Sequence, residues 1–281
     1  MIEAHRTKQR EPSVGTLLQS WRKARNLSQL GLATQADISS RHLCFVETGR
    51  ANPSREMVLL LANVLDVPLR ERNALLLAAG FAPVYAESKL DAPVLAAVNA
   101  ALSAILRQQE PFPAVVMNRQ WDIIRTNQAA TRFFGFLLGK GKTSGPANVL
   151  RMMFDPHALR PFVRNWNAVA ESLVRRVRRE AVGGIQDEGT RLLLAEVLDY
   201  PDVPRSLRDA KGDLPLSPVV PVIFEKGHDR FDFFSAVTTL GTPQDITVQE
   251  VRIESFFPAN DQTTRAARRL AMKGGRLTPA P

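Results

Sequence analysis

The pattern that constrains this chain most is a pair of short helices with a tight corner, between residues 28 and 47. Ser28 is placed to cap a helix that runs to about residue 36, and Ser39 to cap another that ends near Glu47. Asp37 lies at the corner between them, and Asp tolerates the left-handed backbone that a sharp corner needs. The sequence therefore predicts two helices that cross at close range.

Further helices are expected on both sides of this pair. One amphipathic helix is expected over residues 14–26, and two more follow, one after Ser54 and one from Pro68 to Gly80. Gly49, in the intervening loop, is expected to take a positive φ. These signals predict an all-α domain of five helices. Its expected bounds are residues 10–80, and residues 81–110 are expected to hold a linker and a connecting helix.

The hydrophobic pattern changes after residue 110. Two strands, a helical block and three further strands are expected, which predicts an α+β domain with a five-stranded sheet over residues 111–262. In the last expected strand, "DITVQEVRIESFFP", Ile246 and Val248 would face one side and Val251 and Ile253 the other. A bulge near Gln249 and Glu250 is expected to bring these apolar residues to the same side. Residues 263–281 are basic and are expected to form a disordered tail that starts as a short helix.

Composition narrows the class of protein. The 281 residues carry a formal net charge of +9, which favours anionic partners such as nucleic acid. No apolar run reaches the ~18 residues that a membrane helix needs, and the polar first residues do not resemble a secretory signal. One cysteine excludes an internal disulfide framework and fits a reducing compartment. We therefore expect a cytoplasmic protein with no membrane partner.

The outward side of the helix over residues 39–47 is a candidate for reading DNA bases. Leu43 and Val46 are expected to anchor this helix from behind, which leaves Arg41 able to form two hydrogen bonds to a guanine. Neighbouring polar and basic side chains are expected to contact phosphates. The candidate DNA-contacting residues are Gln29, Ser39, Ser40, Arg41, Cys44, Phe45, Arg50, Arg22 and Arg55. The alternative is a helical bundle whose basic residues are merely solvated.

The stretch "SQLGLATQADISSRHLCFVETGRANPS" is similar to the Xre/Cro-repressor helix-turn-helix family. Nearly every position fits that family's pattern, although Asp37 stands where the family usually has Gly. The resemblance implies a sequence-specific DNA-binding regulator. It also implies a structural pair between Glu47 and a basic residue of the first helix, for which Arg25 is the candidate.

Patterns typical of catalysis or metal binding are not found. The four histidines are scattered, and Cys44 lies in the expected DNA-reading helix. "GKGKTSG" lacks the strand, the spacing and the helix of a phosphate-binding loop. We therefore expect no enzyme activity, no metal and no resident cofactor.

Phenylalanine and methionine concentrate after residue 110. Such residues usually fill a core, yet a sheet with helices over one face can also enclose an apolar cavity that binds a ligand. The residue pattern alone leaves both possibilities open.

"VVMNRQWDIIRTNQAATRFFG" and "SPVVPVIFEKGHDRFDFFSAVTTLGTPQDITVQEVRIESFFPA" resemble the ligand-binding domain of MmyB-like transcription regulators. The resemblance implies a PAS-like antiparallel sheet and a small apolar, fatty-acid-like ligand. Thr126 stands where the family commonly has Trp, which implies a larger or more polar pocket. Arg151 is a further candidate for the polar head. The implied ligand-contacting residues are Met117, Trp121, Arg125, Asn127, Phe133, Phe134, Met153, Phe154, Trp166 and Phe233.

Together the two expected domains predict a transcription regulator that binds a palindromic DNA operator as a homodimer and senses a small apolar ligand. The alternative is a DNA-binding regulator whose second domain is a platform for dimerisation or for a protein partner, with no small ligand.

Overall fold

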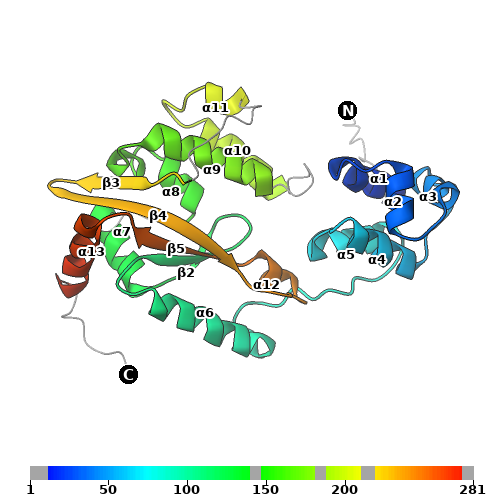
Figure 1. Ribbon diagram of the computed structural model, residues 1–281, viewed down its shortest axis with the longest axis horizontal. Coiled ribbons are helices and arrows are strands. Elements are labelled where there is room, and N and C mark those ends of the chain that lie inside the picture. Colours follow the sequence, from blue (N-terminus) through cyan, green and yellow to red (C-terminus); the bar gives the residue numbers. More distant parts are fainter. Residues whose placement is uncertain (1–11, 140–146, 181–187, 210–218, 274–281) are drawn as a thin grey trace, which may run out of the picture. The chain divides into compact units, whose positions relative to one another are not determined.

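The chain divides into two compact units in a computed structural model that describes residues 12–139, 147–180, 188–209 and 219–273 (Figure 1). The N-terminal unit comprises Met1–Glu87 together with Gln244–Gln249, and the C-terminal unit comprises Ser88–Pro243 together with Glu250–Pro281. Within the described residues, no helix combines the length and the apolar character needed to cross a membrane.

Serine side chains begin four of the helices in the N-terminal unit. Each serine oxygen accepts a hydrogen bond from the backbone N–H three residues later, a donor that the helix itself leaves unpaired. The capping residues are Ser13, Ser28, Ser39 and Ser54. The five predicted helices are confirmed as α1 (Val14–Ala24), α2 (Gln29–Gln35), α3 (Ser40–Glu47), α4 (Arg55–Val64) and α5 (Leu69–Ala78).

The corner between α2 and α3 has the backbone that the sequence predicts. Asp37 takes a φ of 52°, and Gly49, in the loop after α3, takes a φ of 72°. Leu32, Ala33 and Leu43 are almost fully buried where the two helices meet. The corner therefore holds the two helices at close range, as expected.

The segment 244–249 belongs to the N-terminal unit although the sheet strands on both sides of it do not. It contains most of helix α12 (Ile246–Glu250). The side-chain oxygen of Gln249 accepts a hydrogen bond from Leu69 N at 2.7 Å. Because the N-cap residue of α5 is a proline, which offers no side-chain bond, Gln249 caps α5 from a distant part of the chain.

The predicted bulge near Gln249 and Glu250 is wrong, because this stretch is helical. The Asp245 side chain accepts a hydrogen bond from Thr247 N at 2.9 Å and so starts the helix. The alternation of apolar residues shifts here because helix α12 ends and strand β5 begins.

The C-terminal unit is built on one antiparallel five-stranded sheet with the strand order β2-β1-β5-β4-β3, and this confirms the predicted fold class. The central strand, β5, is the last one in the sequence. The strands are β1 (Ala114–Met117), β2 (Ile123–Thr126), β3 (Val222–Lys226), β4 (Asp229–Thr239) and β5 (Arg252–Pro258).

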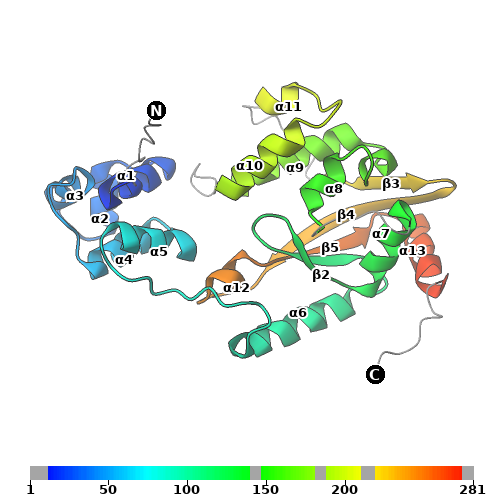
Figure 2. The same cartoon turned by 180° about the vertical axis from the view of Figure 1, so that it is seen from behind.

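Helices cover both faces of this sheet (Figure 2). Helix α6 (Ala96–Gln108), which follows the short turn Pro93–Leu95, packs on one face around Val116 and Ile253. The larger apolar core lies on the other face. It is covered by α7 (Gln128–Leu138), α8 (Val149–Phe154), α9 (Trp166–Glu180), α10 (Glu188–Leu198), the short helix α11 (Ser206–Asp209) and the 3-10 turn Arg160–Phe162.

Helix α13 (Asp261–Lys273) is the short basic helix expected at the start of the tail, and it extends to residue 273. It packs on β4 and α7, with Ala266 and Ala267 buried. Thr263 is also buried, and its hydroxyl accepts a hydrogen bond from Asp232 N at 2.9 Å. Sequence reasoning did not predict this packing, because the basic composition hid an inner stripe of small residues at helical spacing. Residues 274–281 lie outside the described residues.

Helix α1 packs directly against the end of α3, and a glycine permits this contact. A methyl group added to Gly15 would lie 2.4 Å from the carbonyl oxygen of Val46 and 2.7 Å from that of Glu47. Both atoms belong to the backbone, so neither can turn away. No side chain larger than hydrogen fits at this position.

We predict that Gly15→Ala destabilises the N-terminal unit by about 1–3 kcal/mol, because the backbones of α1 and α3 must separate. Urea unfolding followed by circular dichroism and by fluorescence measures this. Gly135→Ala is the matched control, because Gly135 has no atom within 4 Å of its added methyl group. The control should be neutral or stabilising by up to about 1 kcal/mol. Equal stability of the two variants would contradict the packing argument.

Candidate functional site

Helix α3 presents an exposed polar end and a buried apolar back. Ser40 and Arg41 are exposed, whereas Leu43 and Val46 are buried in the unit. The guanidinium carbon of Arg41 lies 5.5 Å from the ring centre of Phe45, which is half-buried. This contact restricts the arginine without using its hydrogen-bond donors. The first turn of α3 is therefore exposed, as the sequence predicts.

The remaining candidate DNA-contacting residues divide into exposed and engaged groups. Arg50 and Arg55 are exposed, and Cys44 is half-buried. The hydroxyl of Ser39 accepts a hydrogen bond from His42 N at 3.1 Å, so this side chain caps α3. Ser39 therefore positions the reading helix.

Arg22 does not take the phosphate-contacting position that the sequence predicts. Its guanidinium forms two hydrogen bonds with Glu47, of 2.6 Å and 2.8 Å, and a third of 2.8 Å with the carbonyl of Leu27. The side chains of Arg22 and Glu47 are 9% and 0% exposed. Gln29 also donates to Glu47, at 2.8 Å, so its side chain is engaged as well. This buried polar cluster joins α1, α2 and α3.

The predicted pair between Arg25 and Glu47 is corrected at the same point. Arg25 donates to the carbonyls of Leu65 and Asp66, at 2.8 Å and 2.7 Å, and so closes the end of α4. Arg22 pairs with Glu47 because it lies one helical turn earlier, on the stripe of Gly15 that faces α3.

Hydrogen bonding sets the charge state of Glu47. Burial by itself would raise the pKa of this carboxyl. The hydrogen bonds from Arg22 and Gln29 outweigh burial, so the pKa of Glu47 lies below its ordinary value of 4.5. Glu47 is therefore ionised at neutral pH and helps to hold the three helices together.

The C-terminal unit contains a cavity of about 50 Å³ between the sheet and helices α7, α8 and α9. Its wall is almost entirely apolar. Among the described lining residues, Glu254 alone carries a charge. The lining residues are Val115, Ile123, Phe134, Val149, Met152, Met153, Leu159, Val169, Leu173, Val222, Phe224, Glu254 and Phe256.

A small polar cluster lies at the Glu254 side of the cavity. The carboxylate of Glu254 accepts hydrogen bonds from the Ser235 hydroxyl at 2.6 Å and from Arg176 Nη1 at 3.2 Å. The guanidinium carbon of Arg176 lies 4.4 Å from the ring centre of Trp121. Trp121 takes a φ of 67° and is buried, so the chain holds this ring under the arginine.

Two of the implied ligand-contacting residues, Phe134 and Met153, line the cavity. Six others belong to the surrounding core but do not line it: Met117, Trp121, Phe133, Phe154, Trp166 and Phe233. Packing explains their positions. Phe133 makes edge contacts with three other rings, at centroid distances of 5.1 Å to 5.5 Å, and Trp166 donates to the carbonyl of Met153 at 2.8 Å.

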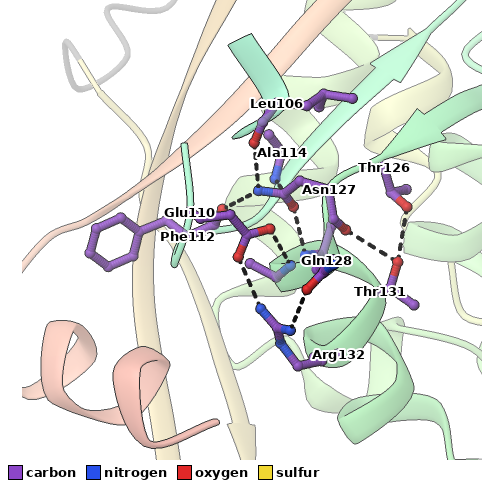
Figure 3. A network of polar contacts seen from close by, with 11 residues as sticks. Leu106, Glu110, Phe112, Ala114, Thr126, Asn127, Gln128, Thr131 and Arg132 are labelled. Atoms are coloured by element: carbon purple, nitrogen blue, oxygen red, sulfur yellow. Dashed lines mark hydrogen bonds and ion pairs between the residues drawn. The ribbon is translucent and has the colours of Figure 1, made fainter. Parts of the chain in front are cut away.

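Asn127 is a structural residue, not the predicted contact for a ligand head (Figure 3). Its side-chain oxygen accepts from Ala114 N and Ala130 N, and its amide donates to the carbonyls of Leu106 and Phe112. All of these partners are backbone atoms. Asn127 therefore caps α7 and ties it to the end of α6 and the start of β1.

The two arginines predicted to meet a ligand head are also directed elsewhere. Arg125 donates to the side chain of Asn99 on α6 at 2.6 Å, on the other face of the sheet from the cavity. It borders an open, polar depression of about 860 Å³. Arg151 forms two hydrogen bonds of 2.8 Å with Glu196 and is largely exposed.

The polar lining residue, Glu254, was missed by sequence reasoning. One signal pointed to it: Glu254 has the same parity as Phe256 in β5, so both face the same side of the sheet. A charged residue at an inward position of a central strand needs a partner. The partner, Arg176, lies 78 residues earlier in the sequence.

Residues 98–270 match the family model described as MmyB-like transcription regulator ligand binding domain, and residues 18–72 match a helix-turn-helix model. The first match covers more than half of the 281 residues. The chain belongs to the MmyB-like transcription regulator family. The regulator therefore carries a helix-turn-helix whose second helix, α3, has an exposed first turn, as a DNA-reading helix requires.

Other comparisons add little about this regulator. No curated protein matches the chain. Among solved structures, "Structure of an RNA-binding Light-Oxygen-Voltage Receptor" is similar at 10% identity, over 97% of this chain and 69% of that one, with a TM-score of 0.24. A score this low supports no argument. Among the residues that the structure describes, no three His, Cys, Asp or Glu side chains form a group that could hold a metal ion.

We predict that Glu47→Gln destabilises the N-terminal unit by about 3 kcal/mol at neutral pH, because Arg22 loses its buried charged partner. The pKa of Glu47 is lowered by folding, so its contribution is present above pH 4.5 and is lost as the pH falls through the folded-state pKa. The stability of wild type and variant should therefore converge at acidic pH. Unfolding by urea across that pH range measures this.

The control for this experiment is Glu87→Gln, which removes a partly exposed partner of Arg70 in the same unit. This change should cost about 0–1 kcal/mol. If Glu47→Gln has as small an effect as the control, or if its effect does not depend on pH, the assigned role of Glu47 is incorrect.

Proposed function

We propose that this regulator binds a palindromic operator as a homodimer and that a small apolar molecule in the C-terminal cavity changes its affinity for DNA. The observation that supports ligand sensing best is the apolar cavity, which lies within the matched ligand-binding domain. Its charged contact, Glu254, is held by two partners. In this proposal the protein acts by binding and not by catalysis.

Base reading is assigned to Arg41. This side chain is exposed at the start of α3, and its contact with Phe45 limits its conformations before DNA is bound. An arginine in the major groove forms two hydrogen bonds with a guanine and discriminates by ~1–3 kcal/mol against the wrong base. Arg50 and Arg55 are exposed and are assigned to phosphates, which position the helix but carry no sequence information.

Arg41→Ala should therefore lower the preference at one base pair per half-site by about 1–3 kcal/mol, while affinity for random DNA changes little. Arg50→Ala should weaken binding to all sequences alike and reduce the salt slope by about one. Selection from randomised DNA, followed by titration at several salt concentrations, separates the two effects. Arg205→Ala is the control, because Arg205 is an exposed arginine of the other unit. Equal losses on selected and random DNA for Arg41→Ala would refute its role.

The cavity must widen to admit a ligand larger than a few atoms. Its volume of about 50 Å³ is far below the ~300–1,000 Å³ of common ligand pockets. The wall contains Met152 and Met153, whose unbranched side chains change conformation easily. Phe134 and Leu173 also line it and are only partly buried. The proposed ligand is therefore admitted by rearrangement of side chains between α7, α8 and α9.

The chain passes directly from the N-terminal unit into the central strand, β5, which contributes to the cavity wall. Strand β5 carries Glu254 and Phe256 of the cavity wall. The segment that precedes it, 244–249, belongs to the N-terminal unit and caps α5 through Gln249. A ligand that shifts β5 would therefore act on the N-terminal unit through this segment, provided that it binds two arrangements with different affinities.

Filling the cavity tests this sensing role. Leu173→Phe adds volume at a partly buried wall position and should cost at most ~3 kcal/mol of stability. Hexan-1-ol, a small apolar probe, should bind the wild type and change its affinity for selected DNA, and the variant should lose both responses. Leu192→Phe is the control, because Leu192 is exposed on α10 outside the cavity. Unchanged responses in Leu173→Phe would place sensing elsewhere.

A platform for a protein partner remains the second candidate function, because one observation favours it. Phe234 is 37% exposed, and its ring stacks on that of Phe257 at 5.5 Å, on the sheet face opposite the cavity. In that case Phe234→Ser would change the oligomeric state or partner binding, and hexan-1-ol would have no effect on DNA affinity. Analytical ultracentrifugation of the full chain distinguishes the two functions.

A further inference from the structure

Strand β4 has, along its second half, a neighbour on one side alone among the described strands. Strand β3 pairs with it over Asp229–Phe233, whereas β4 continues to Thr239 and pairs there with β5 (Figure 1). From Ala236 to Thr239 the strand is exposed. An unpaired strand edge presents backbone donors and acceptors to which another strand can bind. The free edge of β4, residues 234–239, is therefore a candidate interaction surface.

The register of the sheet shows which residues of the free edge direct their backbone outward. In an antiparallel ladder, alternate residues bond to opposite neighbours. Ala259 N donates to the carbonyl of Asp232, at the position that continues the β4–β5 register, so the even-numbered residues of β4 bond to β5. The backbone N–H and C=O groups of Ser235, Val237 and Thr239 therefore point to the free edge. No described residue outside the sheet forms a hydrogen bond with them.

The outer edges of β3 and β2, in contrast, are bonded to other parts of the chain. On β3, the carbonyl of Ile223 accepts from Arg164 N at 2.9 Å, and Ile223 N donates to the side chain of Asn165 at 3.0 Å. On β2, Ile123 N donates to the carbonyl of Ala147 at 2.7 Å. The free edge of β4 is thus the longer exposed edge of this sheet among the described residues.

The sequence of the free edge favours pairing with another strand. Proteins usually protect an exposed edge with charged residues, proline or a bulge. Residues 234–239 read "FSAVTT" and pair with β5 without a register shift, so they contain none of these. Val237, Thr238 and Thr239 are β-branched residues, which are common in strands. A second copy of this uncharged segment brings no unpaired charge into the contact, so it is a complementary partner.

We propose that two copies of this chain pair antiparallel through the free edge of β4, with Val237 on a two-fold axis. Two identical strands that pair in this way form a closed contact, so the product is a dimer. A register centred on Val237 joins all three outward backbone positions, because Ser235 then lies opposite Thr239 of the partner subunit. This inference rests on the proposed homodimer and specifies its interface.

Cysteine cross-linking of the full chain tests the register, with Cys44→Ser removing the natural thiol. Opposite residues in such a ladder have Cα atoms about 5.5 Å apart, which a disulfide spans, whereas diagonal neighbours are about 7–8 Å apart. Val237→Cys should therefore form a disulfide-linked dimer with oxidised glutathione, as seen by non-reducing electrophoresis. Thr238→Cys is the matched control, because it would face Ala236 of the partner subunit and should form about tenfold less.

Val237→Pro removes a backbone N–H that the interface uses and that the sheet of one copy does not. Because proline is tolerated at strand edges, the variant should fold, which circular dichroism establishes. Sedimentation of the full chain should show the dimer dissociation constant raised about tenfold or more, since two hydrogen bonds between the copies are lost. Val237→Thr keeps the N–H and the branched shape, and it should stay within about threefold of the wild type.

A dimer that Val237→Pro leaves intact would overturn the inference and leave the proposed function standing, as would equal cross-linking of the two cysteine variants. If Phe234→Ser dissociates the dimer and Val237→Pro does not, the interface lies on the sheet face. A wild-type chain that stays monomeric with and without selected DNA would overturn both the inference and the proposed homodimer. If the edge contact is found but selected DNA lacks two-fold symmetry, the inference stands and the proposed mode of DNA binding fails.

Discussion

The ion pair between Glu254 and Arg176 constrains much of the C-terminal unit. A carboxylate on the central strand, facing a largely apolar core, is tolerated only with a charged partner and further hydrogen bonds. Helix α9 must therefore approach β5 closely enough for Arg176 to reach it. The ring of Trp121, held by a left-handed backbone, supports the arginine on its other side. The same arrangement leaves an apolar hollow beside the carboxylate.

A comparable polar cluster organises the N-terminal unit. Glu47, at the end of the DNA-reading helix, is bonded to Arg22 of α1 and Gln29 of α2. Backbone contact at Gly15 brings α1 to the same place. The orientation of α3 is therefore set from behind by charge and backbone geometry, while its first turn stays exposed. Buried pairs of this kind contribute little net stability, but breaking one is costly, so they favour one arrangement over its alternatives.

The sequence predicted the elements better than it predicted the contacts between them. Serine caps, the corner at Asp37 and the apolar periodicity are local signals, and they located α1 to α5 and the strand order along the chain correctly. The sequence predicted Arg25 as the partner of Glu47, one helical turn after the observed partner, Arg22. Most residues of the cavity wall were not predicted. The alternation of side chains along a strand shows which face of the sheet each residue occupies, but it does not show which residues of that face border a cavity. Asn127 seemed suited to a ligand, yet its partners are backbone groups that no pattern encodes.

Strand β5 contributes to the cavity wall and directly follows a segment of the N-terminal unit, which neither domain pattern suggests. Its inward residues contact the cavity, its outward residue Ile253 packs under α6, and the segment before it belongs to the N-terminal unit. A molecule larger than a few atoms must displace side chains of the cavity wall, to which α7, α8, α9 and this strand contribute, since the present volume is small. Interiors are close-packed, so such a displacement moves neighbouring groups. Gln249 supplies the hydrogen bond that α5 cannot supply for itself, and α5 packs against α1 and α4. A shift of this segment would therefore change the stability of α5, and this is the physical basis of the proposed route from the cavity to the N-terminal unit.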